Sequence, residues 1–177
     1  MENNGIGKLF EGVDRWTVLI YVLIVLVGFV AILSASYEEG AESIFSFSHF
    51  YMKQLVWMGI SFAVAVVVLL VDASIYHKWA YLFYVLGLLT LVAALLFGRE
   101  VNGAKAWFEI GSVRIQPVEF AKIATALALA RVMSSSSFSI NRAGDLFKVG
   151  LVICLPLLII VMQNDTGSGI VLVSLLF

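Results

Sequence analysis

Charged residues, prolines and cysteines are all scarce in this chain. Only 13% of its 177 residues are charged and 62% are hydrophobic, whereas a soluble domain has about 25% charged and about 45–50% apolar residues. This shortage of charge excludes an ordinary soluble domain and places the chain among membrane proteins. The single cysteine, Cys154, excludes a disulfide framework and a cysteine-based metal site. The two prolines are Pro117, which suits the first turn of a helix, and Pro156, which interrupts an apolar run.

Several motifs that would indicate a function are missing as well. The sequence has no glycine-rich phosphate loop, no nucleophile elbow, no redox pair and no nucleic-acid-binding pattern. His49 and His77 lack carboxylate or cysteine partners at metal-ligand spacing, and we interpret both as interfacial side chains. The sequence therefore predicts neither a metal site nor a nucleic-acid partner.

Long apolar runs make up most of the chain and predict an all-α polytopic membrane protein. A helical run of about 20 residues, rising about 1.5 Å per residue, crosses a hydrocarbon core of ~30 Å. The predicted spans cover residues 16–36, 50–71, 79–97, 117–133, 149–162 and 169–177. We interpret the first as a retained helix, because it is longer than the apolar region of about 7–15 residues in a secretory signal.

The last predicted span is incomplete. Residues 169–177 would form only about 14 Å of helix, and carbonyl groups ending inside lipid would lack hydrogen-bond partners. We therefore expect the chain to be the N-terminal part of a single, larger transmembrane domain.

The distribution of basic residues favours a cytoplasmic N-terminus. With that orientation the cytoplasmic segments hold six basic residues and the outer segments hold four, as the positive-inside rule requires. The inner set is Lys8, Arg15, Lys78, Arg131, Arg142 and Lys148, and the outer set is Lys53, Arg99, Lys105 and Arg114. Three of the outer four lie in the predicted polar loop 98–116, which suggests an anionic ligand at the outer face.

Glu119 and Lys122 are the candidate functional pair, because they lie inside an apolar helix. Residues three apart share one helix face and can pair, and charged residues within spans are rare and usually functional. Two interpretations stay open: an internal ion pair that fixes helix packing, or a pair that lines a polar cavity and binds a head group. We favour the second.

Two polar segments are further candidates. Lys105, Trp107 and Arg114 form either an ordinary interfacial loop or an anchor for pyrophosphate, which accepts several charge-assisted hydrogen bonds. The corner 163–168 holds Gln163, Asp165 and Thr166. Asp165 or Thr166 is expected to cap the helix that follows, although six consecutive small or polar residues exceed what a cap requires.

Three motifs together carry a resemblance. Residues 102–107 (Asn-Gly-Ala-Lys-Ala-Trp), 116–122 (Gln-Pro-Val-Glu, then Lys122) and 163–168 (Gln-Asn-Asp-Thr-Gly-Ser) resemble Gly-Ala-x-Arg-Trp, Gln-Pro-Ser-Glu…Lys and Gln-Pro-Asp-x-Gly-Thr in the SEDS family (shape, elongation, division and sporulation). Ala106, Val118 and Asn164 depart from these patterns, and Lys105 or Arg114 is expected to replace the arginine missing at 106. The short N-terminal tail and the form of the corner favour the elongation branch of the family over the division branch.

This resemblance implies a peptidoglycan glycosyltransferase, a bundle of about ten membrane-spanning helices that polymerises lipid II outside the cytoplasmic membrane. An acceptor 4-hydroxyl attacks the anomeric carbon of the lipid-linked strand, and undecaprenyl pyrophosphate leaves. The aspartate that takes the hydroxyl proton is expected beyond Phe177. The implied cofactor is Mg²⁺ or Mn²⁺, which neutralises the leaving pyrophosphate. The implied partners are membrane lipid, a class B penicillin-binding protein (the transpeptidase) and other membrane proteins of the elongation complex.

Two other functions fit the same residues. A flippase or transporter of a lipid-linked precursor also places charges inside discontinuous helices, and a non-catalytic scaffold of the cell-wall complex is a third alternative. A flippase needs polar residues accessible from both sides, whereas these cluster near the predicted outer face. A scaffold does not need Glu119 and Lys122 inside a helix, so the enzyme is favoured.

Overall fold

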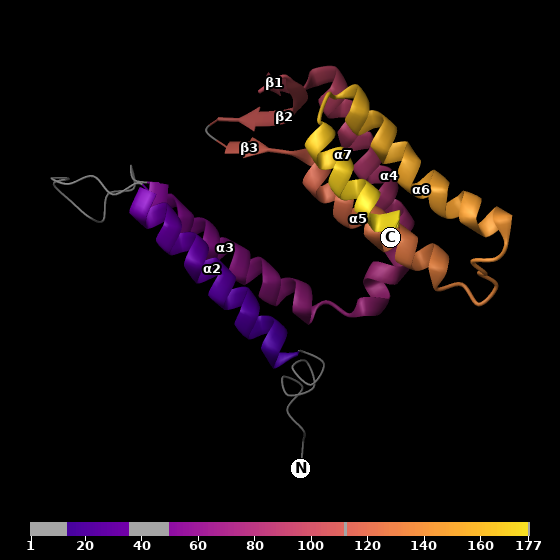
Figure 1. Cartoon of the computed structure of the whole chain (residues 1–177), viewed down its shortest axis with the longest axis horizontal. Coiled ribbons are helices and arrows are strands. Elements are labelled where there is room, and N and C mark those ends of the chain that lie inside the picture. Colours follow the sequence, from indigo (N-terminus) through magenta and orange to yellow (C-terminus); the bar gives the residue numbers. More distant parts are fainter. Residues whose placement is uncertain (1–13, 36–49, 112, 177) are drawn as a thin grey trace, which may run out of the picture. The chain divides into compact units, whose positions relative to one another are not determined.

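The computed structural model describes residues 14–35, 50–111 and 113–176, which form two compact units divided between Asp72 and Ala73 (Figure 1). The remaining positions include Lys8, His49 and the ends of the first and sixth predicted spans, and they lie outside the described residues.

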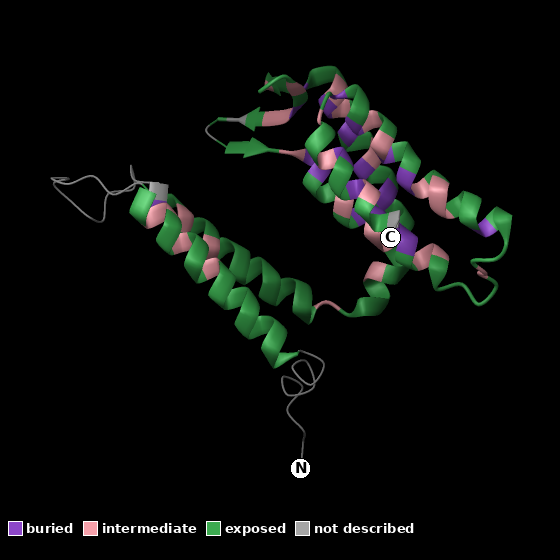
Figure 2. Cartoon of the chain, viewed as in Figure 1, coloured by how far each residue is buried: buried purple, intermediate pink, exposed green. Residues whose placement is uncertain are grey.

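The first unit contains two helices packed against each other, α2 (Arg15–Ala35) and α3 (Phe50–Leu70). Asp14 caps α2, since its carboxylate accepts the backbone N–H of Thr17 at 3.0 Å and the Thr17 hydroxyl at 2.5 Å. These hydrogen bonds from Thr17 and one from the Trp16 N–H lower the pKa of the Asp14 carboxyl. Most side chains of α2 and α3 are exposed within the unit (Figure 2), as an apolar helix facing lipid requires.

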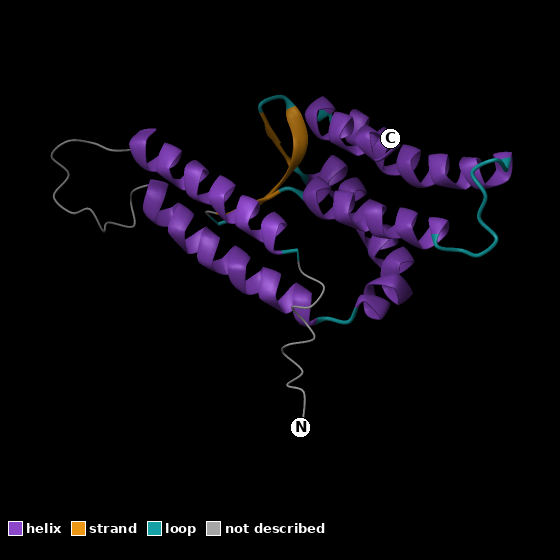
Figure 3. Cartoon of the chain, turned by 60° about the horizontal axis from the view of Figure 1, so that its bottom comes forward, coloured by secondary structure: helices purple, strands orange, loops and turns teal. Residues whose placement is uncertain are grey.

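The second unit contains the remaining helices and a small sheet (Figure 3). In chain order it consists of α4 (Ala73–Phe97), β1 (Arg99–Val101), β2 (Ala104–Ile110), β3 (Val113–Ile115), α5 (Pro117–Met133), α6 (Ala143–Met162), α7 (Thr166–Val173) and a 3₁₀ turn, Ser174–Leu176. Within the described residues, α2, α4, α6 and the segment Tyr51–Leu70 of α3 are long and apolar enough to cross a membrane. The fold class predicted from the sequence, a polytopic helical membrane protein, is thereby confirmed.

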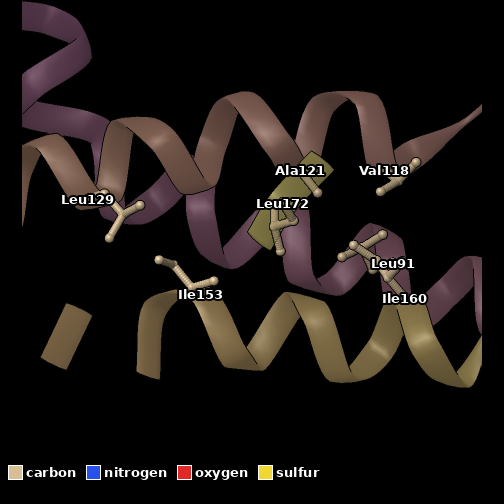
Figure 4. Close-up of a cluster of buried hydrophobic side chains, with 7 residues drawn as sticks. All are labelled: Leu91, Val118, Ala121, Leu129, Ile153, Ile160 and Leu172. Atoms are coloured by element: carbon tan, nitrogen blue, oxygen red, sulfur yellow. The ribbon is translucent and has the colours of Figure 1, made fainter. Parts of the chain in front are cut away.

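The core of the second unit lies where α4, α5, α6 and α7 meet. Figure 4 shows its buried side chains, which are Leu91, Val118, Ala121, Leu129, Ile153, Ile160 and Leu172. Helices α4 and α5 approach closely at Gly87, where an added Cβ would lie 3.4 Å from the Ala124 Cβ. Small residues allow such close packing of membrane helices, whose association depends on van der Waals contact.

Two helices begin six residues earlier than the predicted spans. The segment 72–78 was expected to be a tight turn, but α4 is helical from Ala73; likewise α6 begins at Ala143 within the predicted loop 134–148. Hydropathy marks where a helix leaves the apolar layer, and a helix can continue past that point with polar residues. The sixth predicted helix also begins earlier, at Thr166.

The segment 98–116 is a three-stranded antiparallel meander rather than the predicted loop. Val101 pairs with Ala104, so Asn102 and Gly103 form the two-residue turn between β1 and β2. Their φ angles are +52° and +84°, the signs that a type I′ hairpin turn requires and that Asn-Gly readily adopts. The meander places charged and aromatic side chains beside the helix ends.

Candidate functional site

The second unit has a polar end, which we define as the meander, the start of α5 and the corner 163–165 between α6 and α7. Its geometry depends on one carboxylate. Asp165 accepts a hydrogen bond from the Gln116 side chain (Nε2 to Oδ2, 2.9 Å) and from the backbone N–H and hydroxyl of Ser168 at 3.2 and 2.8 Å. The predicted cap of the last helix is therefore confirmed, with Asp165 rather than the exposed Thr166 in that role.

The meander is hydrogen-bonded to the corner through its first turn. The backbone N–H of Lys105 donates to the Gln163 carbonyl at 3.0 Å, and the Asn164 side-chain amide donates to the Gly103 carbonyl at 3.0 Å. Asn164 has a φ of +61°, a left-handed conformation that asparagine tolerates better than most residues. The asparagine that departs from the family motif thus connects two of the three motifs.

Gln163 connects the corner to the middle of α4. Its side chain is almost fully buried, and its Nε2 donates to the Leu91 carbonyl at 2.7 Å. The side-chain oxygen, Oε1, is buried without a hydrogen-bond partner, which makes it an unsatisfied acceptor in the interior. Gln163 therefore contributes both a fixed contact and an unused acceptor.

Glu109 is the charged centre of the meander. Arg99 and Arg114 both pair with its carboxylate, with 3.4 Å between Arg114 Nε and Glu109 Oε1. The positive charge of Arg99, assisted by the hydrogen bond from Arg114 and against a smaller effect of burial, lowers the pKa of the Glu109 carboxyl. Two exposed arginines share one carboxylate, so this surface carries a net positive charge.

An open pocket of about 650 Å³ lies beside this cluster. Its wall combines the aromatic side chains of Phe97, Trp107 and Phe108 with Arg99 and Glu109. Such a surface suits a ligand with apolar and anionic parts.

Lys105, predicted to bind an anion, donates from its Nζ to the Leu96 carbonyl in the last turn of α4 at 3.1 Å. A cation at a helix C-terminus is favourable, because the helix dipole is negative there. Lys105 is exposed, so this bond leaves further ammonium donors of the side chain facing solvent.

The candidate pair Glu119–Lys122 lies in the first two turns of α5. The Lys122 Nζ is 2.9 Å from the Glu119 Oε1, as the spacing of three residues predicts. The side chain of Glu119 is 56% exposed and that of Lys122 is 23% exposed. Among the described residues each is the only side-chain partner of the other, so the pair does not contact Asp165 or Lys105.

Sequence reasoning missed the contributions of Gln116, Asn164 and Glu109. The first two were quoted only as motif letters, although a polar residue flanking a helix start or a tight corner is a signal for such contacts. Glu109 could have been found from its position between basic residues in a segment of alternating polarity.

A metal-ligand cluster is not found in the part of the chain that the structure describes. No three His, Cys, Asp or Glu side chains there lie close enough to hold an ion. These residues alone do not fit a divalent cation, and no step is assigned to one below.

Comparison with known proteins gives a consistent family match. The model of the FtsW/RodA/SpoVE family, described as cell cycle protein, matches residues 14–177. The chain is 40% identical over 126 residues to the peptidoglycan glycosyltransferase RodA of Treponema pallidum, covering 67% of this chain and 27% of that protein. It is 29% identical over 172 residues to a probable peptidoglycan glycosyltransferase FtsW of Thiomicrospira cyclica, covering 94% of this chain and 44% of that one.

Solved structures give the same result for the fold. The crystal structure of the rod shape determining protein RodA of Thermus thermophilus superposes with a TM-score of 0.79 at 29% identity, covering 92% of this chain and 51% of that one. A chain from a peptidoglycan synthase complex, whose structure concerns the coordination of polymerization and crosslinking, superposes with a TM-score of 0.77 at 28% identity, covering 92% and 45%. The chain thus spans about half the length, or less, of the relatives it matches.

Proposed function

Since the chain belongs to the FtsW/RodA/SpoVE family of cell cycle proteins, we propose that the protein containing it is a peptidoglycan glycosyltransferase that polymerises lipid II. The match of the family model over residues 14–177 is the observation that carries this proposal. The RodA and FtsW relatives are themselves named peptidoglycan glycosyltransferases, and the whole chain superposes on a RodA structure.

The polar end supports this function by its chemistry. Arg99 and Arg114 exceed the charge of Glu109 and lie beside a pocket lined by Trp107. A pyrophosphate accepts charge-assisted hydrogen bonds from arginine, and an aromatic wall suits the sugar or lipid next to it. We assign Arg114, Lys105 and Trp107 to binding the lipid pyrophosphate.

Glu119 and Lys122 are proposed to line the polar cavity in which the lipid-linked strand lies. The acceptor hydroxyl attacks the anomeric carbon, the bond from that carbon to the pyrophosphate oxygen breaks, and a carboxylate takes the hydroxyl proton. We expect that carboxylate beyond Phe177. The described residues supply binding and position rather than the base.

The finer assignments are also proposals. We assign the protein to the elongation branch, RodA, on its short N-terminal tail and the form of its 163–168 corner. We place it in the cytoplasmic membrane with its N-terminus inside and the polar end outside, as the count of basic residues favours. A class B penicillin-binding protein is the proposed transpeptidase partner, in line with the complex in which one structural neighbour lies.

The experiment that tests this function compares two activities of the purified full-length protein. Lipid II polymerisation is measured in detergent with and without the transpeptidase partner, and lipid II translocation is measured in sealed vesicles. Glycan strands without translocation are expected. Translocation without strands, from folded protein in both settings, would instead identify a flippase, and neither activity would identify a scaffold.

A further inference from the structure

The end of the second unit opposite the meander contains a polar pocket of about 470 Å³. It is enclosed by the start of α4, the end of α5, the serine-rich segment that follows, and the start of α6. Its lining includes His77, Arg131, Asp145, Lys148 and the four serines 134–137. The function proposed above uses none of these residues.

A ring of hydrogen bonds fixes Arg131 in this pocket. Its guanidinium donates to His77 Nδ1, since a guanidinium has only donors. With that nitrogen accepting, His77 Nε2–H donates to the Ser134 hydroxyl at 2.9 Å, and that hydroxyl donates to the Arg131 carbonyl at 3.0 Å. The ring uses one guanidinium nitrogen, so the donors on the other two stay available to a ligand.

The charges in the pocket are unbalanced toward positive. The buried carboxylate of Asp145 is neutralised twice, by Lys148 at 2.9 Å and by Arg142 at 3.6 Å, and it accepts the Ser139 N–H at 3.2 Å. Arg131 makes no ion pair with any described residue. An anion in the pocket would therefore meet a fixed, uncompensated guanidinium and several serine hydroxyls, with the one nearby carboxylate already paired.

The pocket lies at the depth of a membrane interface. Trp79 follows His77 by two residues, and the Lys78 Nζ lies 5.8 Å from the centre of the Trp79 ring. Tryptophan and lysine at a helix end gather at the lipid head groups. Basic pockets between the cytoplasmic ends of membrane helices are suited to anionic lipid head groups, and the count of basic residues places this end inside.

From this geometry we infer that the pocket between α4, α5 and α6 binds the phosphate group of an anionic membrane phospholipid. Arg131 supplies the charge-assisted hydrogen bonds, the serine hydroxyls supply neutral donors, and the acyl chains lie along the apolar helix surface. The phosphate chemistry is shared with free inorganic phosphate, and the position beside Trp79 selects the lipid.

The test measures binding to the purified full-length protein in a non-ionic detergent. Short-chain dioctanoyl phosphatidylglycerol is titrated and the dissociation constant is read from the rise in unfolding temperature; dioctanoyl phosphatidylcholine and inorganic phosphate are the comparison ligands. We expect the phosphatidylglycerol to bind most tightly, and Arg131→Gln to weaken its binding about tenfold or more. Arg15→Gln, which removes a basic residue from the first helix, is the matched control and should bind like wild type.

A second variant keeps the inference testable if Arg131→Gln fails to fold. Ser136→Glu places a negative charge on an exposed position in the pocket wall, so it should abolish the preference for phosphatidylglycerol without removing a packed side chain. Equal affinity for the two lipids in wild type, or unchanged binding in both variants, would overturn the inference. Equal affinity for inorganic phosphate and phosphatidylglycerol would overturn the assignment to a lipid.

Discussion

Gln116 and Asp165, 49 residues apart in the sequence, are joined by a hydrogen bond of 2.9 Å. The bond connects the residue before α5 to the carboxylate that caps α7. Two of the motifs that carry the family resemblance therefore form one structural element, and Lys105 and Asn164 connect the third motif to it.

The first prediction concerns this contact. Asp165→Ala removes the cap of α7 and the partner of Gln116, so it should lower stability by about 1–2 kcal/mol. Gln116→Ala removes the shared bond alone and should cost less. In a double-mutant cycle, followed by thermal unfolding, the two changes should be non-additive by about 0.5 kcal/mol or more. Additive effects would contradict a direct contact.

The second prediction separates the structural and functional roles of Glu119. An exposed pair at this helical spacing stabilises a helix by only about 0.2–0.5 kcal/mol. Glu119→Ala should therefore change the unfolding temperature little, while abolishing most of the polymerisation activity by leaving Lys122 uncompensated. The exchange Glu119→Lys with Lys122→Glu should recover folding but only part of the activity, since it reverses the charges at the helix start. Full activity in Glu119→Ala would exclude the functional role.

The third prediction uses the unsatisfied oxygen of Gln163. Gln163→Met removes the bond to the Leu91 carbonyl and also the buried acceptor, so its effect on stability should be small. Gln163→Glu places a carboxyl oxygen against that carbonyl with no donor, and it should destabilise the protein by about 2 kcal/mol or more. Unfolding temperatures of the two variants check this order. Equal values would show that the amide makes no bond in the folded protein.

The fourth prediction is a pH dependence of the meander. Arg99 and Arg114 lower the pKa of Glu109 below its ordinary value of 4.5. Because the folded-state pKa is the lower one, the stabilisation is complete above the ordinary value and is lost as pH falls through the folded-state pKa. The fluorescence of Trp107, with the other tryptophans replaced by phenylalanine, should report the meander opening over this acidic range. The transition should disappear in Glu109→Gln, and its persistence there would assign it to another group.

The sequence predicts the helices well where apolar runs decide them, and less well where they end. Helix α4 begins at Ala73 rather than near Trp79, because the polar residues His77 and Lys78 continue the helix beyond the apolar layer. The meander was missed because its strands are short, although Asn102-Gly103 is a strong local signal for a hairpin.

Short-range features of the site were predictable, and long-range ones were not. The Glu119–Lys122 pair and the Asp165 cap follow from spacings of three residues along one helix. The contacts of Gln163 with Leu91 and of Gln116 with Asp165 join positions 72 and 49 residues apart, which no local pattern encodes.

The most direct measurement is lipid II polymerisation by the purified full-length protein with its transpeptidase partner, comparing wild type with Lys122→Ala. Lys53→Ala, which removes a lysine from the first turn of α3, is the matched control. We predict glycan strands from wild type and from the control, and none from folded Lys122→Ala. Strands of normal length and yield from Lys122→Ala would contradict a glycosyltransferase cavity built on the charged start of α5.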